Sequence, residues 1–583
     1  CSPHGLLGGQ RVSFTLMLSK IVDVLRGRSS VKSSYVILAV AVFWVAVANF
    51  SFLSVLLQVY PLTFENAGFL VSVLVGFTAL LVFGLALLCH RYTMKPITIS
   101  LLIASAFAAY FMDSYHVIID EQMVGNIFTT DTREAIDLLS PTMALYVVLI
   151  GLLPAWLVYR TKIHFQPFKR EIVSNLKLVG LSLSVMVGMF FLFSPSYTSF
   201  FREHKEIRAY FNPGNFVYGT ARFVGRWFEA DTSVVYALGQ DAAVREGDGH
   251  RELIIMVVGE TARADRFSLN GYERETNPLL QQEDVISFTN FMSCGTLTAI
   301  SVPCMFSIYR ADEYSAAKVA TRENALDVLT HAGVNVLWRD NNSSSKGVAD
   351  RVPYQDYRSP TVNPVCDIEC RDVGMLDGLQ DYIDANPEGD ILVVLHQMGN
   401  HGPAYYKRYP EEFEKFKPTC QTNELSDCTS EEIDNAYDNA ILYTDYFLAQ
   451  TIDLLKQNES EFETAMMYVS DHGESLGEFG LYLHGMPNFM APTSQRQVPV
   501  ILWLGESYHD ADPEEIRARR DEQFSHDNVF HTLLGFMEIE SAVYDPSMDI
   551  FQTRTEELAR PRPSSPSSSI AVSSPPIEDT LVE

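Results

Sequence analysis

Positive charge is scarce in this 583-residue sequence. Lysine and arginine together number 43, against 72 aspartate and glutamate residues, so the formal net charge is −29. Non-specific binding to nucleic acid requires a basic surface, and we therefore expect no nucleic-acid partner. Most of the acidic excess lies in the second half of the chain. Anionic ligands would have to be bound there by specific local cations, because the domain as a whole has no positive electrostatic field.

The sequence also lacks a CxxC motif, which would favour a cytosolic zinc site. Six of the eight cysteines instead fall in the second half as close pairs: Cys294 with Cys304, Cys366 with Cys370, and Cys420 with Cys428. Pairs that close such short loops are typical of disulfides in an oxidising compartment. We predict three disulfides and a second half that folds outside the cytoplasm.

Long apolar runs are confined to the part of the chain before about Ser194. They lie at 35–58, 66–89, 97–112, 141–159 and 176–195. Most reach the ~20 residues that a helix needs to cross the hydrocarbon core of a membrane, and the third is short. After about Asp248 the composition becomes mixed and acidic, as in a globular domain. The pattern predicts an N-terminal five-helix transmembrane bundle followed by a soluble domain.

Charge in the loops predicts the orientation of this bundle. Basic residues cluster before the first run, after the second, and between the fourth and fifth: Arg26, Arg28, Lys32, Arg91, Lys95, Arg160, Lys162, Lys169 and Arg170. The loop between the third and fourth runs is acidic, with Arg133 as its basic residue. Because short cytoplasmic loops retain lysine and arginine, the N-terminus should be cytoplasmic. Five crossings then place the large domain outside, in agreement with the cysteine pairs.

These patterns divide the chain into five segments. We expect a cytoplasmic segment at 1–33, a transmembrane domain at 34–196, an extracytoplasmic connector at 197–247, a globular domain at 248–558 and a disordered Ser/Pro-rich tail at 559–583. The chain begins with Cys1, and a lipidated cysteine would have to lie outside the cytoplasm. We therefore expect an N-terminal extension, with Met17 as the true start.

The globular half alternates buried strands with helices. Its apolar runs are ELIIMVVG, VNVLWR, DILVVLHQM, TAMMYVSD and VPVILWL, and a helix is expected at Ala436–Leu455. Such runs predict a largely parallel sheet in an α/β domain. Sites in open sheets of this kind lie beyond the carboxyl ends of the strands. Glu260, Asp471 and His472 follow two of the runs, and two carboxylates with an imidazole suit a zinc ion with an open coordination position.

A nucleophile for such a site is expected in residues 293–307, SCGTLTAISVPCMFS. This stretch of small residues suits a loop-to-helix turn whose backbone amides could receive a phosphate. Thr296, Thr298 and Ser301 are all candidates on chemistry alone, since an alcohol becomes a good nucleophile once a metal or base lowers its pKa.

Five segments resemble one family, the lipid A phosphoethanolamine transferases, which include transferable polymyxin-resistance enzymes and belong to the alkaline phosphatase and sulfatase superfamily. The segments are VVGETARADRFSLNGYERETNP, SCGTLTAISVPCMFS, LWRDNNSSSKG, LHQMGNHGPAYYKRYP and YVSDHGESLGEFGLYLHGMP. The resemblance extends from about residue 30 to 540 in the same order. It implies that the domain at 248–558 is a periplasmic catalytic domain with an alkaline-phosphatase/sulfatase-like fold.

The resemblance also implies roles for individual residues. Thr298 would be the nucleophile, and Glu260, Asp471, His472 and the Thr298 oxygen would bind zinc. His401 and His484 would lie beside the phosphate, as acid–base groups or as ligands of a second, weaker zinc. Asn342 and Lys346 would contact the phosphoethanolamine. The three cysteine pairs match the disulfides of the family.

The membrane half contributes candidates as well. Asn126, Thr130 and Glu134 recur every four residues and would share one face of a helix. Such a stripe is more often a solvated face. With Tyr115, however, these residues match family positions proposed to line the lipid substrate pocket.

The reaction implied by the resemblance is a ping-pong transfer of phosphoethanolamine. The donor would be phosphatidylethanolamine and the acceptor a phosphate of lipid A, in the bacterial inner membrane. We expect a monomer and polymyxin (colistin) resistance as the phenotype. A sulfatase is disfavoured, because Thr298–Ser301 lacks the C/S-x-P-x-R core. A phosphoglycerol transferase, a transferase for another periplasmic glycan acceptor and a non-catalytic membrane scaffold remain as alternatives.

Further expectations concern polar residues in or near these motifs. His396, His526 and His531 are expected to be structural, the last two on one helix. Glu474 and Glu478 could be partners of a zinc-bound histidine or solvated helix caps.

Overall fold

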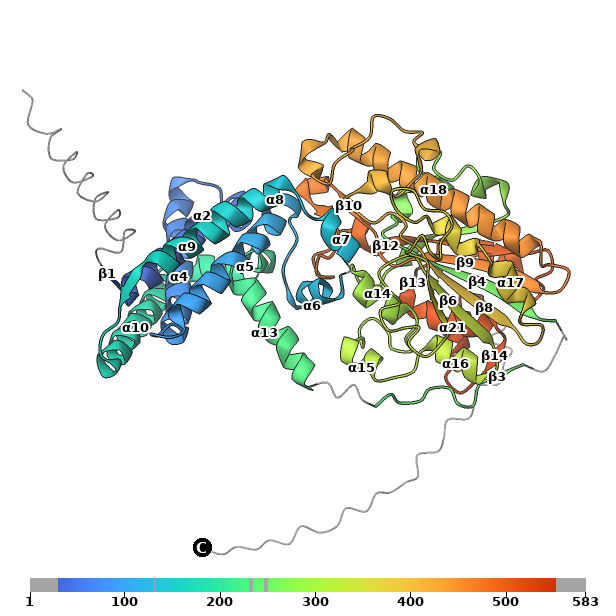
Figure 1. Ribbon diagram of the computed structural model, residues 1–583, viewed down its shortest axis with the longest axis horizontal. Coiled ribbons are helices and arrows are strands. Elements are labelled where there is room, and N and C mark those ends of the chain that lie inside the picture. The colour runs from blue at the N-terminus through green and yellow to red at the C-terminus, as the bar shows by residue number, and fades with distance from the viewer. Residues whose placement is uncertain (1–29, 131, 203, 230–233, 246–249, 552–583) are drawn as a thin grey trace, which may run out of the picture.

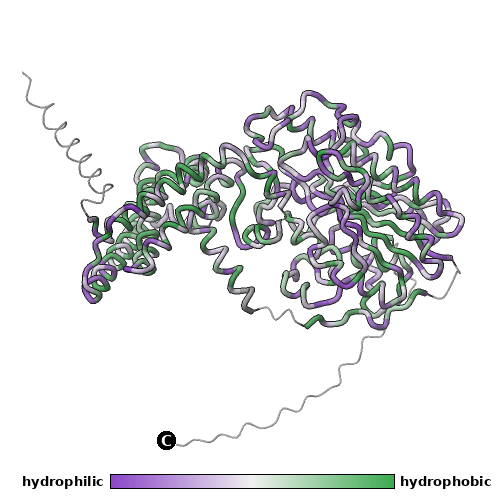
Figure 2. Tube along the Cα trace, in the orientation of Figure 1, coloured by the Kyte–Doolittle hydropathy of each residue, from purple (hydrophilic) through white to green (hydrophobic). Residues whose placement is uncertain are grey.

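The chain forms an apolar helical bundle and an α/β domain (Figure 1). A computed structural model describes residues 30–551, except 131, 203, 230–233 and 246–249. Hydrophobic residues cover much of the bundle, whereas in the α/β domain they concentrate in the central strands (Figure 2). The predicted start at Met17 and the predicted tail at 559–583 lie outside the described residues.

The bundle contains the five predicted apolar segments. Its helices are α2 (Ser33–Val47), α3 (Phe50–Val59), α4 (Phe64–Leu88), α5 (Met94–Tyr115), α8 (Pro141–Tyr146), the π-helical η1 (Val147–Leu152), α9 (Leu153–Arg160) and α10 (Phe168–Leu192). Four helices (α4, α5, Pro141–Arg160 and α10) are long and apolar enough to cross a membrane, and the bent pair α2–α3 makes a fifth if it is one span. The third segment has 22 residues, because helix α5 includes polar residues at both ends that hydropathy leaves out. Helix α10 starts before the predicted run, so Lys169 and Arg170 lie in its first turn instead of in a loop.

A pair of buried asparagines accompanies the 60° bend between α2 and α3. Asn49 Nδ2 donates to the Asn212 carbonyl at 2.6 Å, and the Asn212 N–H donates to Asn49 Oδ1 at 2.8 Å. Asn212 Nδ2 also donates to the carbonyls of Ala48 and Ser105. A broken helix is tolerated in a bundle when other groups satisfy its free backbone atoms, and the segment after α10 supplies them here. Its helices are α11 (Ser194–Arg202), α12 (Lys205–Ala209) and α13 (Gly214–Glu229).

An eight-stranded sheet forms the centre of the α/β domain. In spatial order its strands are β13 (Phe524–Ser525), β5 (Ile286–Met292), β12 (Gln497–Leu504), β9 (Glu463–Ser470), β4 (Glu252–Gly259), β8 (Ile391–His396), β6 (Asn335–Asp340) and β7 (Tyr354–Asp356). The strands are parallel except for β12, which runs antiparallel to both β5 and β9. The chain therefore leaves β12 at the edge opposite to the ends of β4 and β9.

Both faces of this sheet are covered, which explains why its strands are continuous apolar runs. In β4, Leu253, Ile255 and Val257 pack in one core with helices α17 (Leu379–Asp384) and α18 (Ser430–Lys456). The alternate residues of β4 pack in a second core with α16 (Ala325–His331) and α21 (Val529–Phe536). Helix α18 begins six residues before the predicted Ala436, because Thr429 and Glu432 form a capping box.

The described residues also form shorter elements, which include β1 (Ser30–Lys32), β2 (Lys162–His164), β3 (Ala243–Val244), β10 (Ser475–Leu476), β11 (Tyr482–Leu483), β14 (Ile539–Glu540), α15 (Ala316–Ala320), α19 (Thr493–Arg496) and α20 (Pro513–Ala518).

Two short helices lie between the bundle and the α/β domain (Figure 1). They are α6 (Glu121–Thr129) and α7 (Thr132–Asp137). Thr130 is extended, with φ −65° and ψ 130°, and its hydroxyl donates to the Asn126 carbonyl at 2.8 Å. The prediction that Asn126, Thr130 and Glu134 share one face of a single helix is therefore wrong, because the helix ends between them.

Ion pairs hold this junction together. The Asp137 carboxylate accepts from Lys407 Nζ at 2.5 Å and from Arg408 Nη2 at 2.9 Å. The Tyr115 hydroxyl donates to the Asn423 carbonyl at 3.3 Å. On the other side of the contact, Met486 of the α/β domain is 7% exposed and lies in the apolar core of the bundle. The loops of the α/β domain that face the bundle are thus packed against it.

Candidate active site

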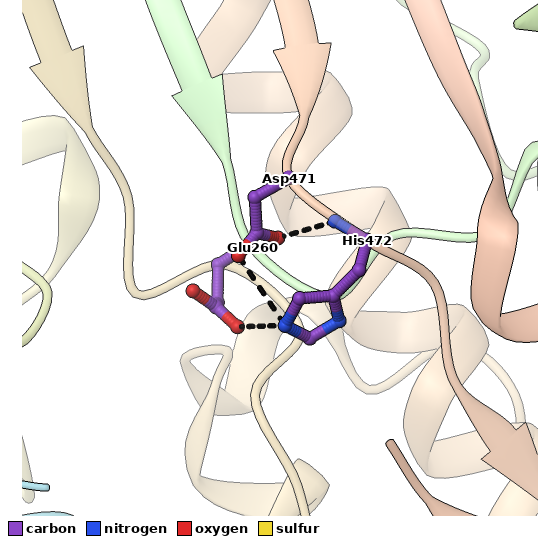
Figure 3. A group of neighbouring side chains, drawn as sticks. All are labelled: Glu260, Asp471 and His472. Atoms are coloured by element: carbon purple, nitrogen blue, oxygen red, sulfur yellow. Dashed lines mark hydrogen bonds and ion pairs between the residues drawn. The ribbon is translucent and has the colours of Figure 1, made fainter. Parts of the chain in front are cut away.

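The carboxyl ends of the two central strands bring the predicted metal ligands together. Strands β4 and β9 pair in parallel with Gly259 opposite Ser470, so Glu260 and Asp471 leave the sheet side by side. One donor atom from each of Glu260, Asp471 and His472 lies within 4.8 Å of the other two (Figure 3). All three side chains are fully buried. Pairing of distant strands thus assembles a compact set of two carboxylates and one imidazole.

The hydrogen bonds of this set leave its inner atoms available to a cation. Asp471 Oδ1 accepts from the backbone N–H groups of Thr261 and His472, whereas Oδ2 is buried and has no hydrogen-bond partner. His472 Nδ1 is 3.0 Å from the Gly473 carbonyl, which can only accept. Nδ1 must therefore carry a proton, and Nε2 lies 3.3 Å from Asp471 Oδ2 and 3.5 Å from Glu260 Oε1. Two carboxylate oxygens and one imidazole nitrogen fit a divalent cation of the zinc type.

The charges of the cluster are strongly coupled. Burial raises the pKa of Asp471 to about 7, and the Glu260 carboxylate adds to this effect. Burial also opposes ionisation of Glu260, but the surrounding histidines, His472 first, outweigh it and hold the pKa of Glu260 below its usual range. Without a cation, two buried carboxylates in contact favour keeping one proton between them.

Of the three candidate nucleophiles, Thr298 alone is turned towards this cluster. It is the first residue of helix α14 (Thr298–Met305), and its Oγ1 lies 3.2 Å from Glu260 Oε2 and 3.3 Å from His472 Nε2. The Thr296 hydroxyl donates to the Met486 carbonyl instead. Ser301 Oγ accepts from the Gly295 N–H. The geometry thus distinguishes hydroxyls that the sequence alone left equivalent.

The loop that carries Thr298 is fixed at both ends. The Cys294–Cys304 disulfide closes it, and the other two predicted pairs, Cys366–Cys370 and Cys420–Cys428, are bonded as well. His526 accepts from the Cys294 N–H through Nδ1 at 3.1 Å and donates to the Ser470 carbonyl through Nε2 at 3.0 Å. His526 therefore fastens the loop to the end of β9, a structural role whose specific partners the sequence did not indicate.

The other histidines expected to be structural are also buried and paired. His396 Nδ1 is 2.9 Å from Asp340 Oδ2, and His531 Nδ1 accepts from the Asp545 N–H at 3.1 Å. The expectation that His526 and His531 share one helix is wrong, since His526 lies in a 3₁₀ turn that precedes α21.

Asn342 contacts the cluster directly. Its Nδ2 donates to Glu260 Oε2 at 2.8 Å and to the Gln397 carbonyl at 2.7 Å. Asn342 thereby orients Glu260, a contact that differs from the contact with phosphoethanolamine that the resemblance implies. Lys346, on the same loop, donates to Ser343 Oγ at 2.6 Å. The structure therefore places Asn342 at the cluster and ties Lys346 to its own loop.

His401 and His484 lie next to each other beside the cluster. Their ring centroids are 5.4 Å apart, and the His484 ring is 4.3 Å from that of His472. Burial, together with the charge of His472, lowers the pKa of His484 to about 3, and burial lowers the pKa of His401. Both shifts favour the neutral imidazole, which is the form that binds a metal ion.

The structure distinguishes Glu474 from Glu478, which the sequence left as either partners of a histidine or solvated helix caps. Glu474 is fully buried, with Oε1 3.3 Å from His484 Nδ1, so it is not a solvated cap. Glu478 forms an ion pair with Arg263 at 2.5 Å. Glu474 is thus a positioning partner for His484, whereas Glu478 belongs to a separate ion pair.

A cavity of about 240 Å³ lies at the junction between the bundle and the α/β domain. Glu134 and Asp137 line it from the bundle side, and Met398 and Arg408 line it from the α/β domain. Arg408 Nε donates to the His401 carbonyl at 2.6 Å, so the cavity adjoins the histidine pair. Sequence patterns did not single out Arg408 and Asp137, although Arg408 lies in the same motif as His401.

The contact between Asn342 and Glu260 leads to a prediction. Asn342→Ala should lower the rate of the reaction at this site by roughly 10- to 100-fold, because loss of a partner that orients a metal ligand typically costs this much. Asn342→Asp should be worse, since it places a further negative charge against Glu260. The matched control is Asn341→Ala on the same loop, whose Nδ2 donates to Asp372 and the Cys370 carbonyl instead. Equal losses in the two alanine variants, measured as kcat and metal content, would contradict the proposed role of Asn342.

Comparisons with known proteins agree with this arrangement. Residues 77–228 match the family profile "Phosphoethanolamine transferase EptA/EptB", and residues 252–539 match "Sulfatase". The chain is 43% identical to phosphatidylethanolamine transferase Mcr-1 of Escherichia coli over 88% of this chain and 96% of the relative. It is 38% identical to phosphoethanolamine transferase EptA of E. coli K12, with the same coverage.

A solved structure extends the similarity to both halves. The integral membrane protein lipooligosaccharide phosphoethanolamine transferase A of Neisseria meningitidis superposes with a TM-score of 0.87 at 33% identity, over 90% of this chain and 99% of that one. These relatives are 33–43% identical to the chain and align with it over nearly their whole length. The chain therefore belongs to the phosphoethanolamine transferase family of membrane-anchored enzymes in the alkaline phosphatase superfamily.

Proposed function

We propose that this protein transfers phosphoethanolamine from phosphatidylethanolamine to a phosphate of lipid A through a covalent intermediate on Thr298. The observation that carries this proposal is the position of Thr298 Oγ1, 3.2 Å from Glu260 and 3.3 Å from His472. The similarity of the chain to Mcr-1, a phosphatidylethanolamine transferase, supports the choice of donor. The bundle is proposed to lie in the bacterial inner membrane as a monomer, with the N-terminus cytoplasmic. The α/β domain would be periplasmic, which its three disulfides support.

Glu260, Asp471, His472 and the Thr298 oxygen would hold a zinc ion. When bound, zinc would supply a Lewis acid that lowers the pKa of the Thr298 hydroxyl. The unpartnered Asp471 Oδ2 and the position of His472 Nε2, 3.3 Å from that oxygen and 3.3 Å from Thr298 Oγ1, support this assignment. Asn342 would keep Glu260 oriented as a ligand. His401 and His484 remain candidate ligands for a second, weaker ion.

The first half of the reaction would form the bond between Thr298 Oγ1 and phosphorus and break the bond from phosphorus to the diacylglycerol oxygen. The proton lost by Thr298 would pass to the departing diacylglycerol oxygen by way of His401 or His484, which lie beside the cluster. In the second half, a phosphate oxygen of lipid A would attack the same phosphorus and break its bond to Thr298 Oγ1, which would take up the proton of the attacking phosphate through His401 or His484. Burial of the histidine pair would limit access of water to the adduct.

Added phosphoethanolamine changes the charge of the acceptor. Each ethanolamine ammonium offsets negative charge on a lipid A phosphate and weakens the attraction of cationic peptides. We therefore propose polymyxin resistance as the cellular effect.

Mass spectrometry of lipid A tests this function. A polymyxin-sensitive Gram-negative host that expresses the protein should show lipid A carrying added phosphoethanolamine together with lower polymyxin sensitivity. The same host expressing Thr298→Ala at equal level should show neither. Unchanged lipid A and unchanged sensitivity with the well-expressed parent would count against lipid A as acceptor. Addition of phosphoglycerol instead would identify the donor group as different.

A further inference from the structure

A second acidic cluster lies at the edge of the sheet opposite to Thr298. Glu252 and Glu463 are the first residues of β4 and β9 and are paired in register. Strand β12 runs the other way, so the chain beyond its end at Leu504 reaches the same edge and carries Asp510 there. One carboxylate oxygen from each of Glu252, Glu463 and Asp510 lies within 4.8 Å of the other two. Three segments distant in sequence therefore meet through their carboxylates.

The two glutamates of this cluster are buried. Glu252 is 3% exposed, and its Oε2 is fully covered without any hydrogen-bond partner. Glu463 is 2% exposed, and its Oε2 accepts one bond, from the His509 N–H at 3.0 Å. In the part of the chain that the structure describes, no lysine or arginine forms an ion pair with either glutamate. The neighbouring Arg251 instead donates to the carbonyls of Asn386 and Gly389.

Such an arrangement carries a cost that a bound cation would remove. Burial raises the pKa of Glu252 to about 10, and the negative charges of Asp510, Glu463, Asp390 and Glu538 add to the effect. A buried carboxylate without a partner is costly unless it binds a proton or a cation. The free Glu252 Oε2 points to such a ligand, because buried polar atoms in folded proteins are nearly always paired.

We propose that Glu252, Glu463 and Asp510 form a binding site for a hard divalent cation of the calcium type. The donors are all oxygen, as calcium prefers, and oxygens within 4.8 Å of one another can each lie roughly 2.3–2.6 Å from a shared ion. Asp510 is exposed, so water can complete the coordination from its side. The ion fastens the beginnings of β4 and β9 to the loop after β12. With three protein carboxylates the site belongs to the weak extracellular class, with a Kd of about 10⁻⁴–10⁻³ M.

Calcium titration of the purified full-length protein in detergent tests this proposal. At pH 7.5 and constant zinc, CaCl₂ at about ten times the Kd should raise the Tm of the α/β domain by about 4 °C, and the rise should follow the logarithm of the calcium concentration above the Kd. The double variant Glu252→Gln/Glu463→Gln should lose this rise. Glu515→Gln, an exposed acidic residue on α20, should keep it and controls for general charge effects. An equal rise in the double variant and the parent would overturn the proposal.

A proton held by the cluster in place of the cation would give a different result. The raised pKa of Glu252 stabilises the fold below pH 4.5, and this stability is lost as pH rises towards about 10. Three results together would overturn the cation site. The Tm of the parent would fall as pH rises between these limits, calcium would leave that Tm unchanged, and the Glu252→Gln variant would lack the pH dependence. If the double variant does not fold, two other measurements replace it. The single variant Asp510→Asn should lose the rise in Tm with calcium, and calcium should displace terbium from the parent protein, measured by terbium luminescence. Absence of terbium binding that calcium displaces would count against the site.

Discussion

Thr298→Ala is expected to abolish transfer, with a loss of roughly 10⁴-fold or more, as is usual when the nucleophile of a covalent mechanism is removed. The neighbouring hydroxyls cannot replace it. Thr296 Oγ1 is 2.6 Å from the Met486 carbonyl, and Ser301 Oγ is bound by the Gly295 N–H. Thr298→Ser keeps an oxygen at the same position and should retain measurable activity.

Intact-mass measurement tests for the proposed adduct. The intact mass of the parent, incubated with phosphatidylethanolamine and no acceptor, should increase by one phosphoethanolamine group, whereas Thr298→Ala should stay unmodified. Ser301→Ala is the matched control on the same helix and should be modified like the parent. A modified Thr298→Ala protein, or an unmodified but correctly folded Ser301→Ala protein, would assign the nucleophile to another residue.

Selective removal of zinc should abolish transfer and make the stability of the α/β domain depend on pH. Asp471 has its folded pKa raised from 3.8 to about 7 by burial and by Glu260. Its contribution to stability is therefore complete below pH 3.8 and is lost as pH rises through about 7. A metal-free protein should consequently have a lower Tm at pH 8 than at pH 5.5, by about 5 °C or more, since an uncompensated buried charge is strongly destabilising.

Differential scanning calorimetry with a zinc-selective chelator, at constant calcium, measures this effect. The zinc-loaded protein should show the opposite trend or none, because the ion binds the ionised carboxylates and competes with protons. Asp471→Asn removes the titrating group, so its metal-free Tm should change little between the two pH values. Identical pH profiles with and without the chelator, in a protein that has demonstrably lost zinc, would be incompatible with this site.

Much of the α/β domain could be predicted because its signals are local. A strand buried on both faces must be a continuous apolar run, and the polar residues that follow β4 and β9 must emerge at the same edge when these strands are parallel. For this reason the sequence alone is enough to group Glu260, Asp471 and His472 into one cluster. The disulfides could be predicted for a similar reason, since each closes a short loop.

Other features depend on contacts that no local pattern encodes. The periodicity of Asn126, Thr130 and Glu134 predicted one helix, but the Thr130 hydroxyl bonds the Asn126 carbonyl where the helix ends. Composition did not reveal that β12 runs antiparallel, and Asp510 reaches Glu252 only for that reason. The first feature depends on where a short helix ends, and the second depends on the direction of a strand that pairs with segments distant in sequence.

The packing of Met486 in the core of the bundle has a practical consequence for inhibitor discovery. Met486 follows His484 by two residues, and Leu481, Met490 and Ala491 pack against the same core. A catalytic half severed from its anchor would expose these side chains to water and release the loop that presents His484. Compounds selected against the severed half would bind this loop in the absence of the bundle that packs against it. Screens on the intact protein, in detergent or nanodiscs, should therefore rank ligands of the histidine pair differently from screens on the soluble fragment.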